Sequence, residues 1–311
     1  MRLHVGMMVW LGIALFSWSS AQWVWSSESG WTNPEYASKS NTKALFESGR
    51  EKYQAKKYEE AVVIFTRLRE EYPASKYSED ILFYQAECFF ALNRLSEAHE
   101  SFYTYFLDYP NSKRLENIVS REYDIGVTFL ESENTELLGM KIINAREEGI
   151  RVLKTLIKIY PHSEFSDLAQ YKIAQYYFLL EDYDTAETEY QELLDKYLLS
   201  KWRSSAVFQM AMTYLNRHQG TAYDASWLQK SAQGFRKFLK DYPEDQQVPQ
   251  AKKLLQETLD QLAQKLYETA EYYERAGAHK SALHYYKLVT VRYPESHFST
   301  EASAILKENG Q

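Results

Sequence analysis

The sequence predicts an all-α protein, an α-solenoid of about six helical hairpins that follow one another along the chain. Three observations carry this prediction. A short Tyr-Pro-x-Ser motif recurs, a small residue stands at a fixed distance before each copy, and apolar residues between the copies follow helical spacing. Glycine and proline are also scarce, with 11 and 7 among 311 residues, which favours helix over irregular structure.

The recurring motif is predicted to mark the end of one helix and the beginning of the next. Proline cannot continue a helix and restricts the residue before it, while serine can accept hydrogen bonds from backbone donors where a new helix starts. We therefore expect a structural role, and no catalytic role, for these serines. The copies are YPAS at 72–75, YPNS at 109–112, YPHS at 160–163 and YPES at 293–296, with a further proline at Pro243 and a variant, YLLS, at 197–200.

Small residues recur twelve positions before the proline, and a large apolar residue follows each of them four positions later. Helices approach closely only where side chains are short, so this spacing predicts where the two helices of each hairpin touch. The small residues of the second helices are Ala61, Ala98, Gly149, Ala186, Ser231 and Ala282. Their large partners are Phe65, Phe102, Leu153, Tyr190, Phe235 and Tyr286. Small residues of four first helices are predicted to be Gly49, Ala86, Ala174 and Ala270.

The first 21 residues have the order of a secretory signal peptide. A basic start at Arg2 precedes an apolar run from Val5 to Trp18, and Ser19-Ser20-Ala21 follows with small residues at a cleavage site. As a helix this run spans about 21 Å, which is short of the roughly 30 Å hydrocarbon core of a bilayer. We therefore expect an exported protein that begins near Gln22, and the alternative is an uncleaved membrane anchor.

Residues 22–42 are predicted to be a Trp-rich flexible leader, and residues 43–311 the solenoid. Trp23, Trp25 and Trp31 lie in a polar segment that cannot bury them locally. Three interpretations remain open for them. The leader docks on a membrane interface or a partner, it folds back into the groove of its own chain, or it is disordered.

The hairpin pattern is lengthened in three places. Insertions are predicted at 132–148 and 216–227. A single helix of about 27 residues is expected to open at Pro249 and to close at Gly277, shared between the fifth and sixth hairpins. Residues 298–308 are predicted to form the capping helix that the end of a solenoid requires.

Composition argues against several classes of function. The formal charge is −7, from 36 basic and 43 acidic residues, without the basic patch that a nucleic-acid binder needs. The one cysteine, Cys88, is expected to be a buried apolar residue, and no two of the seven histidines are four residues apart. No phosphate-binding glycine loop and no Gly-x-Ser-x-Gly motif is present. We therefore predict no enzyme, no metal and no cofactor.

Helical hairpins in which a small residue, a large apolar residue and a proline recur in this order resemble tetratricopeptide repeats (TPRs), which form a right-handed superhelix. The stretch 262–296, "LAQKLYETAEYYERAGAHKSALHYYKLVTVRYPES", further resembles the outer-membrane assembly lipoprotein family BamD, over about 43–296. In that family a similar segment precedes the last hairpin. The residues that fit it are Leu262, Ala263, Leu266, Tyr267, Ala270, Tyr272 and Tyr273.

The resemblance implies an exported, non-enzymatic scaffold in outer-membrane β-barrel assembly, periplasmic and outer-membrane associated. Its implied partners are components of the assembly machinery or unfolded outer-membrane proteins, with no nucleic acid and at most peripheral membrane contact. Family members are typically lipidated at a cysteine after the signal peptide. Residues 19–22 contain no cysteine, so lipidation is not expected there. The alternative is another periplasmic TPR scaffold, such as a CpoB-like coordinator of division and peptidoglycan synthesis, although residues 22–42 lack the heptads of that group.

In TPR-like stacks the first helices line a concave groove that binds extended peptides. On that resemblance, aromatic and charged residues of three hairpins are expected to line the groove. These residues are Phe46, Arg50 and Tyr53, then Phe83, Glu87 and Phe90, and then Tyr171, Gln175 and Phe178. The alternative for each is packing between neighbouring hairpins.

Overall fold

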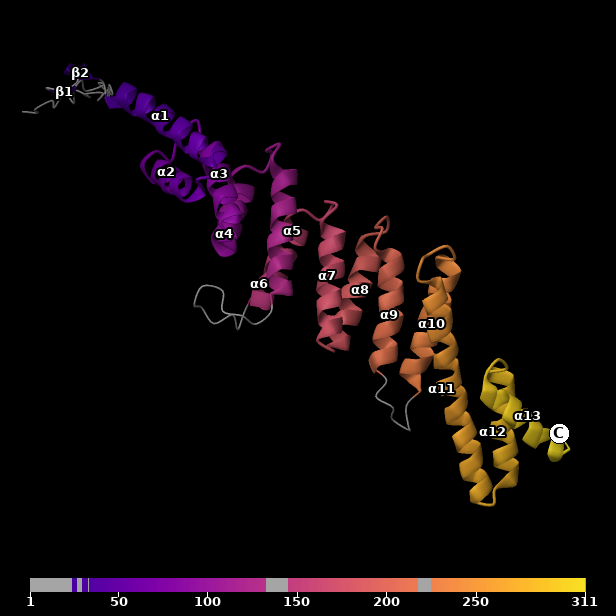
Figure 1. Cartoon of the computed structure of the whole chain (residues 1–311). Coiled ribbons are helices and arrows are strands. Elements are labelled where there is room, and N and C mark those ends of the chain that lie inside the picture. The colour runs from indigo at the N-terminus through magenta and orange to yellow at the C-terminus, as the bar shows by residue number, and fades with distance from the viewer. Residues whose placement is uncertain (1–23, 27–29, 33, 133–144, 218–224, 311) are drawn as a thin grey trace, which may run out of the picture. The chain divides into compact units, whose positions relative to one another are not determined.

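A computed structural model describes residues 24–26, 30–32, 34–132, 145–217 and 225–310 (Figure 1). The chain divides into two compact units at Pro110 and Asn111, and each unit is described by itself. We call residues 1–110 the N-unit and residues 111–311 the C-unit.

The N-unit contains two helical hairpins preceded by a short strand pair. Strands β1 and β2 pair antiparallel, with Trp25 opposite Trp31 in the register. Helix α1 packs against α2, and α3 against α4. The elements are β1 (Val24–Ser26), β2 (Gly30–Thr32), α1 (Pro34–Gln54), α2 (Tyr58–Glu71), α3 (Ser78–Ala91) and α4 (Leu95–Asp108).

The C-unit contains four further hairpins and a terminal helix. Each helix packs against the next along the chain, and α13 covers the last hairpin. The hairpins pair α5 (Leu115–Glu131) with α6 (Ala145–Ile159), α7 (Ser166–Leu179) with α8 (Tyr183–Lys196), α9 (Arg203–Arg217) with α10 (Ser226–Asp241), and α11 (Val248–Arg275) with α12 (His279–Arg292), before α13 (His297–Glu308).

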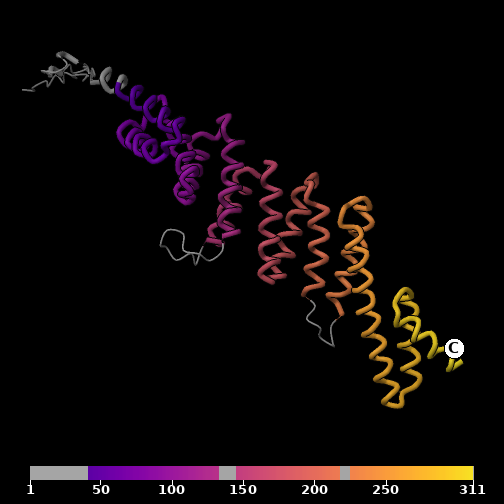
Figure 2. Tube along the Cα trace, in the orientation of Figure 1, coloured from indigo at the N-terminus to yellow at the C-terminus, as the bar shows by residue number. Residues whose placement is uncertain are grey.

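The predicted α-solenoid of six TPR-type hairpins is confirmed in the described residues. The long helix is α11, with 28 residues, and Figure 2 shows it running past the end of α10 to reach α12. Gly277 follows it with a φ of +75°, a left-handed conformation that glycine adopts without strain. The predicted capping helix is α13.

The first helix begins earlier than predicted. Helix α1 starts at Pro34, inside the range 22–42 assigned to the leader, and the two strands lie in that range as well. Proline suits a first helical position because its fixed φ fits the helix and its missing N–H has no partner there. The residues of the predicted signal peptide, 1–21, lie outside the described part of the chain.

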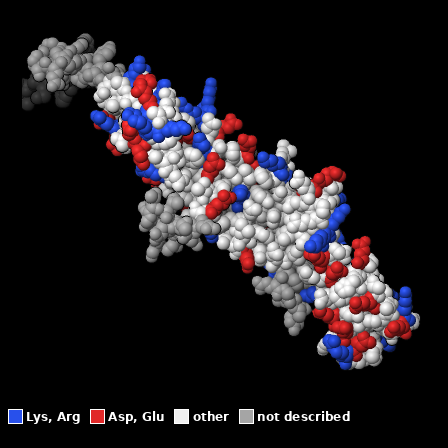
Figure 3. All heavy atoms as spheres, viewed as in Figure 1, with Lys and Arg blue, Asp and Glu red and all other residues white. Residues whose placement is uncertain are grey.

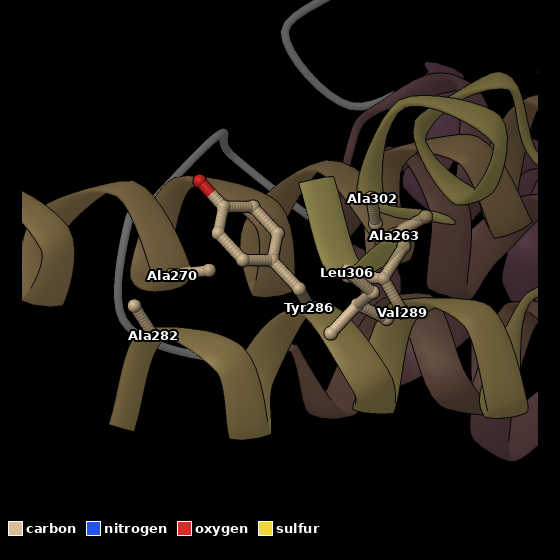
Figure 4. Packing of buried hydrophobic residues seen from close by; sticks show 7 residues of the cluster. All are labelled: Ala263, Ala270, Ala282, Tyr286, Val289, Ala302 and Leu306. Carbon is tan, nitrogen blue, oxygen red and sulfur yellow. The ribbon is translucent and has the colours of Figure 1, made fainter. Parts of the chain in front are cut away.

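The predicted small and large residues form the hairpin cores. All of the large partners and the second-helix alanines are buried, and the first-helix alanines Ala86, Ala174 and Ala270 are fully buried. In the last hairpin, Figure 4 shows the Tyr286 ring beside Ala270, while Val289, Leu306, Ala263 and Ala302 gather next to it. The periodic row of small residues therefore marks the contacts between paired helices, as the sequence predicted.

Two helices approach closely at a pair of glycines in the first hairpin of the C-unit. A Cβ atom added to Gly149 of α6 would lie 2.7 Å from the carbonyl oxygen of Gly126 of α5, and 2.9 Å from the backbone nitrogen of Leu130. Both neighbours are backbone atoms, which cannot move aside without shifting a helix. Gly126 was not predicted, because the long connection between α5 and α6 removes it from the regular spacing.

The Tyr-Pro-x-Ser turns join the hairpins as predicted. In the turn at 72–75, the Ser75 amide donates to the Tyr72 carbonyl at 3.1 Å, and the Ser75 hydroxyl accepts from the Tyr77 amide at 3.2 Å. The turn at 293–296 repeats this, because Ser296 Oγ accepts from the Phe298 amide at 3.3 Å. Each serine therefore accepts a hydrogen bond from the backbone amide two residues further on, and Ser296 in this way caps the N-terminus of α13.

Three buried tyrosines donate their hydroxyl groups to carboxylates, and a fourth does not. Tyr105 donates to Glu79 at 2.7 Å, Tyr214 to Glu187 at 2.9 Å and Tyr286 to Glu274 at 2.9 Å. The Tyr190 hydroxyl is buried and has no hydrogen-bond partner among the described residues. Burial raises the pKa of the Tyr190 phenol far above its ordinary value.

Tyr190→Phe is therefore expected to stabilise the protein by about 1 kcal/mol, because it removes a buried polar group that makes no hydrogen bond within the described part of the chain. Tyr286→Phe is the matched change, and it is expected to destabilise because it removes the bond to Glu274. Denaturant unfolding followed by circular dichroism measures both. A loss of stability in Tyr190→Phe would show that its hydroxyl has a partner.

None of the described helices is long and apolar enough to cross a membrane.

Candidate protein-binding surface

Aromatic stacking places two of the predicted groove residues in the hairpin cores. Phe46 stacks on Tyr77 with ring centroids 4.5 Å apart, and Tyr171 stacks on Trp202 at 5.2 Å. Phe46 is 3 % exposed and Tyr171 8 %. The prediction that these two rings line an open groove is therefore wrong, and the alternative of packing between hairpins holds for them.

A simple sequence signal would have found these stacks. Four of the hairpin ends carry an aromatic residue five positions after the tyrosine of the turn. In the structure each of these rings contacts an aromatic residue of the preceding first helix. The four pairs are Tyr77 with Phe46, Phe165 with Tyr123, Trp202 with Tyr171, and Phe298 with Tyr267.

Glu87 was also predicted to line the groove, and this prediction is wrong because Glu87 is buried within α3, with 8 % of its surface exposed. Its neighbour Cys88 is also buried, as predicted, and burial together with the Glu87 charge raises the pKa of the Cys88 thiol to about 12. This thiol is therefore protonated and unreactive at physiological pH.

The other predicted residues of the N-unit are half-buried. The Tyr53 ring packs edge-on against the Tyr58 ring, with centroids 5.7 Å apart, and the centroids of the Phe83 and Tyr105 rings are 6.3 Å apart. Phe90 is half-buried at the end of α3. Arg50 is 40 % exposed in its side chain, and its guanidinium pairs with the Glu47 carboxylate at 3.5 Å. These four residues remain predictions for binding.

In the C-unit, Gln175 lies on a row of α7, which we call the α7 stripe, whose first three members are half-buried and whose last is exposed. Its members are four, three and four positions apart, so they share one helix face. They are Leu168, Lys172, Gln175 and Leu179. Phe178 is next to this row and half-buried, and its ring centroid lies 6.0 Å from that of Tyr183. Gln175 and Phe178 therefore remain groove predictions.

Helix α9, which contacts α7, carries the matching row, which we call the α9 stripe. It comprises Ser205, Gln209, Met212 and Asn216. Between Arg203 and Arg217, α9 contains no charged residue. In the α7 stripe the one charged residue, Lys172, pairs with Glu131 at 3.3 Å. The two stripes form a surface with little free charge, and Figure 3 shows a largely uncharged area over the middle of the C-unit.

The α7 stripe ends in exposed apolar side chains that the prediction missed. Leu179 is 73 % exposed and Leu180 is 49 % exposed. The sequence indicates this exposure through the apolar run Tyr-Tyr-Phe-Leu-Leu at 176–180, because five consecutive apolar residues cannot all lie on the buried face of one helix. Exposed apolar side chains beside a charge-poor stripe are typical of the centre of a protein interface.

Two hollows lie on the second helices of the C-unit, which were not predicted to bind. One of about 580 Å³ lies between α8, α9 and α10 and is lined by Val207, Met210 and Tyr214 together with charged residues such as Lys237. Another of about 660 Å³ lies between α6, α7 and α8. There the buried Glu189 accepts hydrogen bonds from Lys154 at 2.8 Å and from Gln170 at 2.6 Å. The second hollow is thus lined by a polar network that is already internally paired.

Among the described residues, no group of three histidine, cysteine, aspartate or glutamate side chains lies close enough to hold a metal ion. The two stripes present side-chain amides, a hydroxyl group, apolar groups and one ammonium group, that of Lys172, which is paired with Glu131. The arrangement suits non-covalent binding of a polypeptide.

Comparison with known families gives a match that covers most of the chain. The model described as "YfiO: Outer membrane lipoprotein" matches residues 38–176 and again residues 144–311. Together these matches span both units from α1 to α13. No curated protein matches the chain.

Among solved structures, similar chains include TPR proteins of two bacteria. One, a thermophilic TPR protein from Thermus thermophilus, is 18 % identical with a TM-score of 0.34, over 69 % of this chain and 98 % of that one. The other, from Parabacteroides merdae, is 14 % identical with a TM-score of 0.36, over 86 % and 97 %. The type IV pilus biogenesis factor PilW is 14 % identical with a TM-score of 0.31, over 85 % and 98 %.

Proposed function

Because the chain belongs to the YfiO family of outer membrane lipoproteins, we propose that it is an exported scaffold that binds protein partners during outer-membrane β-barrel assembly. The protein is a BamD-like TPR protein, and TPR-type hairpins are a protein-interaction fold. The observation that carries the proposal is the family match, which extends over residues 38–311. The predicted signal peptide at 1–21 agrees with export.

The stripes of α7 and α9 are the proposed binding surface in the C-unit. Leu179 and Leu180 supply exposed apolar area, which gains free energy when a partner covers it. The side-chain amides of Gln175, Gln209 and Asn216 both donate and accept hydrogen bonds, so they can pair with the backbone of an extended segment. The scarcity of free charge favours partner segments that carry alternating apolar and neutral polar side chains, as barrel strands do.

The proposed scaffold carries out no chemistry and needs no cofactor. Its contribution is to hold partners by shape and apolar contact, with the N-unit offering Arg50, Tyr53, Phe83 and Phe90 as further contacts. These side chains are half-buried on helices, so little conformational entropy is lost when a partner packs on them.

Leu179→Glu is expected to reduce capture of barrel-assembly partners from detergent-solubilised envelope membranes by at least about tenfold, because a charge at the centre of an apolar contact must be desolvated. Affinity purification with quantitative mass spectrometry measures the loss. Leu179 is 73 % exposed, so the change should leave the fold intact, which thermal unfolding can verify.

The matched control is Leu107→Glu, at a leucine of α4 that is 63 % exposed and lies outside both stripes. It should capture the same partners as the unchanged protein. Equal capture by both variants would remove the α7 stripe from the interface. Recovery of division or peptidoglycan-synthesis proteins in place of barrel-assembly components would contradict the proposed role itself.

A further inference from the structure

The turn between α8 and α9 differs from the other hairpin ends in the side chains at its tip. Its sequence is Tyr-Leu-Leu-Ser, where the other turns carry proline followed by Ala, Asn, His or Glu. Leu198 is 69 % exposed and Leu199 is 99 % exposed. Two adjacent leucines therefore project into solvent at a position where the chain elsewhere places proline and a small or polar residue.

The fold of this turn does not require the leucines. The Ser200 amide donates to the Tyr197 carbonyl at 3.1 Å and Ser200 Oγ accepts from the Trp202 amide at 3.0 Å, as in the proline-containing turns. The Tyr197 backbone, with φ −114° and ψ 69°, is close to that of Tyr72 before Pro73, with φ −134° and ψ 56°. Proline would therefore fit at position 198, and the leucines have no structural task that the turn reveals.

Basic and aromatic side chains flank the leucines. Lys196 pairs with Glu192 at 2.6 Å, while Lys201 has no carboxylate within ion-pair distance among the described residues and lies 5.7 Å from the centre of the Trp202 ring. Arg203 donates to the carbonyl of Leu194 at 2.5 Å and so caps the end of α8. The tip therefore combines two exposed leucines and an aromatic ring with the Lys201 ammonium group, while the carboxylates of Glu192 and Asp195 lie at the end of α8.

We propose that this turn, residues 196–202, inserts its tip into the surface of an anionic lipid bilayer. The two leucines would enter the boundary between headgroups and acyl chains, while Lys201 would lie at the level of the lipid phosphates. Cations next to a membrane-inserted apolar tip add electrostatic attraction to anionic lipids. The turn would hold the C-unit at the membrane surface, independently of what binds the α7 and α9 stripes.

A bilayer suits this tip better than a protein partner. Two side chains on a narrow turn expose far less than the roughly 1,200 Å² that a stable protein interface buries. A membrane needs no matching surface, because any apolar side chain that reaches the acyl region is transferred out of water. The only cysteine, Cys88, is buried within α3, so it does not offer a lipid attachment site on the folded surface.

The direct test places an environment-sensitive dye at the tip of the turn in the full chain. Leu199→Cys carries the dye, and Cys88 stays unlabelled because it is buried and its pKa is raised to about 12. Glu244→Cys is the matched control, since Glu244 is exposed and holds the equivalent position in the turn at 242–245. Vesicles of phosphatidylethanolamine with phosphatidylglycerol are compared with vesicles of phosphatidylcholine alone.

The proposal predicts a blue shift at position 199 with the anionic vesicles, quenching of that dye by brominated acyl chains, and neither effect at position 244. An unchanged emission at position 199 in the presence of bound vesicles would overturn it. A shift caused by envelope proteins without lipid would also overturn it, in favour of a protein partner.

A second variant tests the leucines without adding a label. Leu198→Pro with Leu199→Asn turns the segment into YPNS, which this chain already uses at 109–112, so the fold should be kept. Flotation with the anionic vesicles should show about tenfold weaker binding than for the unchanged chain. Equal flotation would contradict the proposal. Partner capture through the α7 stripe should be unaffected, which separates this proposal from the proposed scaffold function.

Discussion

Gly149→Val is expected to cause a large loss of stability, about 3 kcal/mol, because added carbon atoms at this position meet backbone on the facing helix. The Cβ alone would lie 2.7 Å from the Gly126 carbonyl oxygen. To relieve this contact α5 and α6 must separate, which would also loosen the buried Leu153 and Leu130. Guanidinium unfolding followed by circular dichroism measures the change.

Lys158→Val is the control for Gly149→Val, because it introduces the same side chain on the exposed face of α6. It should change stability by less than about 0.5 kcal/mol. If Gly149→Val were equally mild, α5 and α6 would not approach each other through their glycines. The hairpin packing described for the C-unit would then be wrong.

Ala61→Leu and Ala98→Leu are each expected to lower stability by about 1–3 kcal/mol, because they overpack the hairpins of the N-unit. Both alanines are fully buried, and Phe65 and Phe102 fill the space one helical turn further on. The added branched side chain can be accommodated only by moving a neighbouring helix or by forcing side chains out of preferred rotamers. Denaturant melts of the two variants give the free energy directly.

Ala91→Leu, at an exposed alanine of α3, controls for the change of side chain. It should be close to neutral, since leucine and alanine both favour helix. Neutral melts for Ala61→Leu and Ala98→Leu would mean that these alanines do not mark the helix contacts. Other positions of the repeat would then have to form the contacts between paired helices.

The hairpins could be predicted from the sequence because each depends on short-range rules. Proline ends a helix wherever it follows the tyrosine, and a small residue is needed wherever two helices touch. The places where prediction failed are those without a local rule. Gly126 is offset by the long connection before α6, and α1 extends back to Pro34 because nothing between Pro34 and residue 42 stops a helix.

The proposed binding surface was harder to predict, because it depends on the rotation of each first helix. A shift of one position turns a side chain by about 100° around the helix axis. Tyr171 and Gln175 were predicted to share the groove, yet Tyr171 packs inward on Trp202 while Gln175 is half-buried on the α7 stripe. The inward direction of Tyr171 is set by a partner in the next hairpin, which helical periodicity within one helix does not reveal.

The proposed function requires that this chain hold protein partners of outer-membrane assembly on the exposed surfaces of its hairpins. Crosslinking mass spectrometry on intact cells tests this proposal most directly, since Lys43 of α1 is exposed and the Lys172 side chain of α7 is 30 % exposed. The account predicts crosslinks from Lys172 to a barrel-assembly component or to an unfolded outer-membrane protein. Crosslinks from Lys172 confined to cytoplasmic proteins, or to division proteins alone, would contradict it.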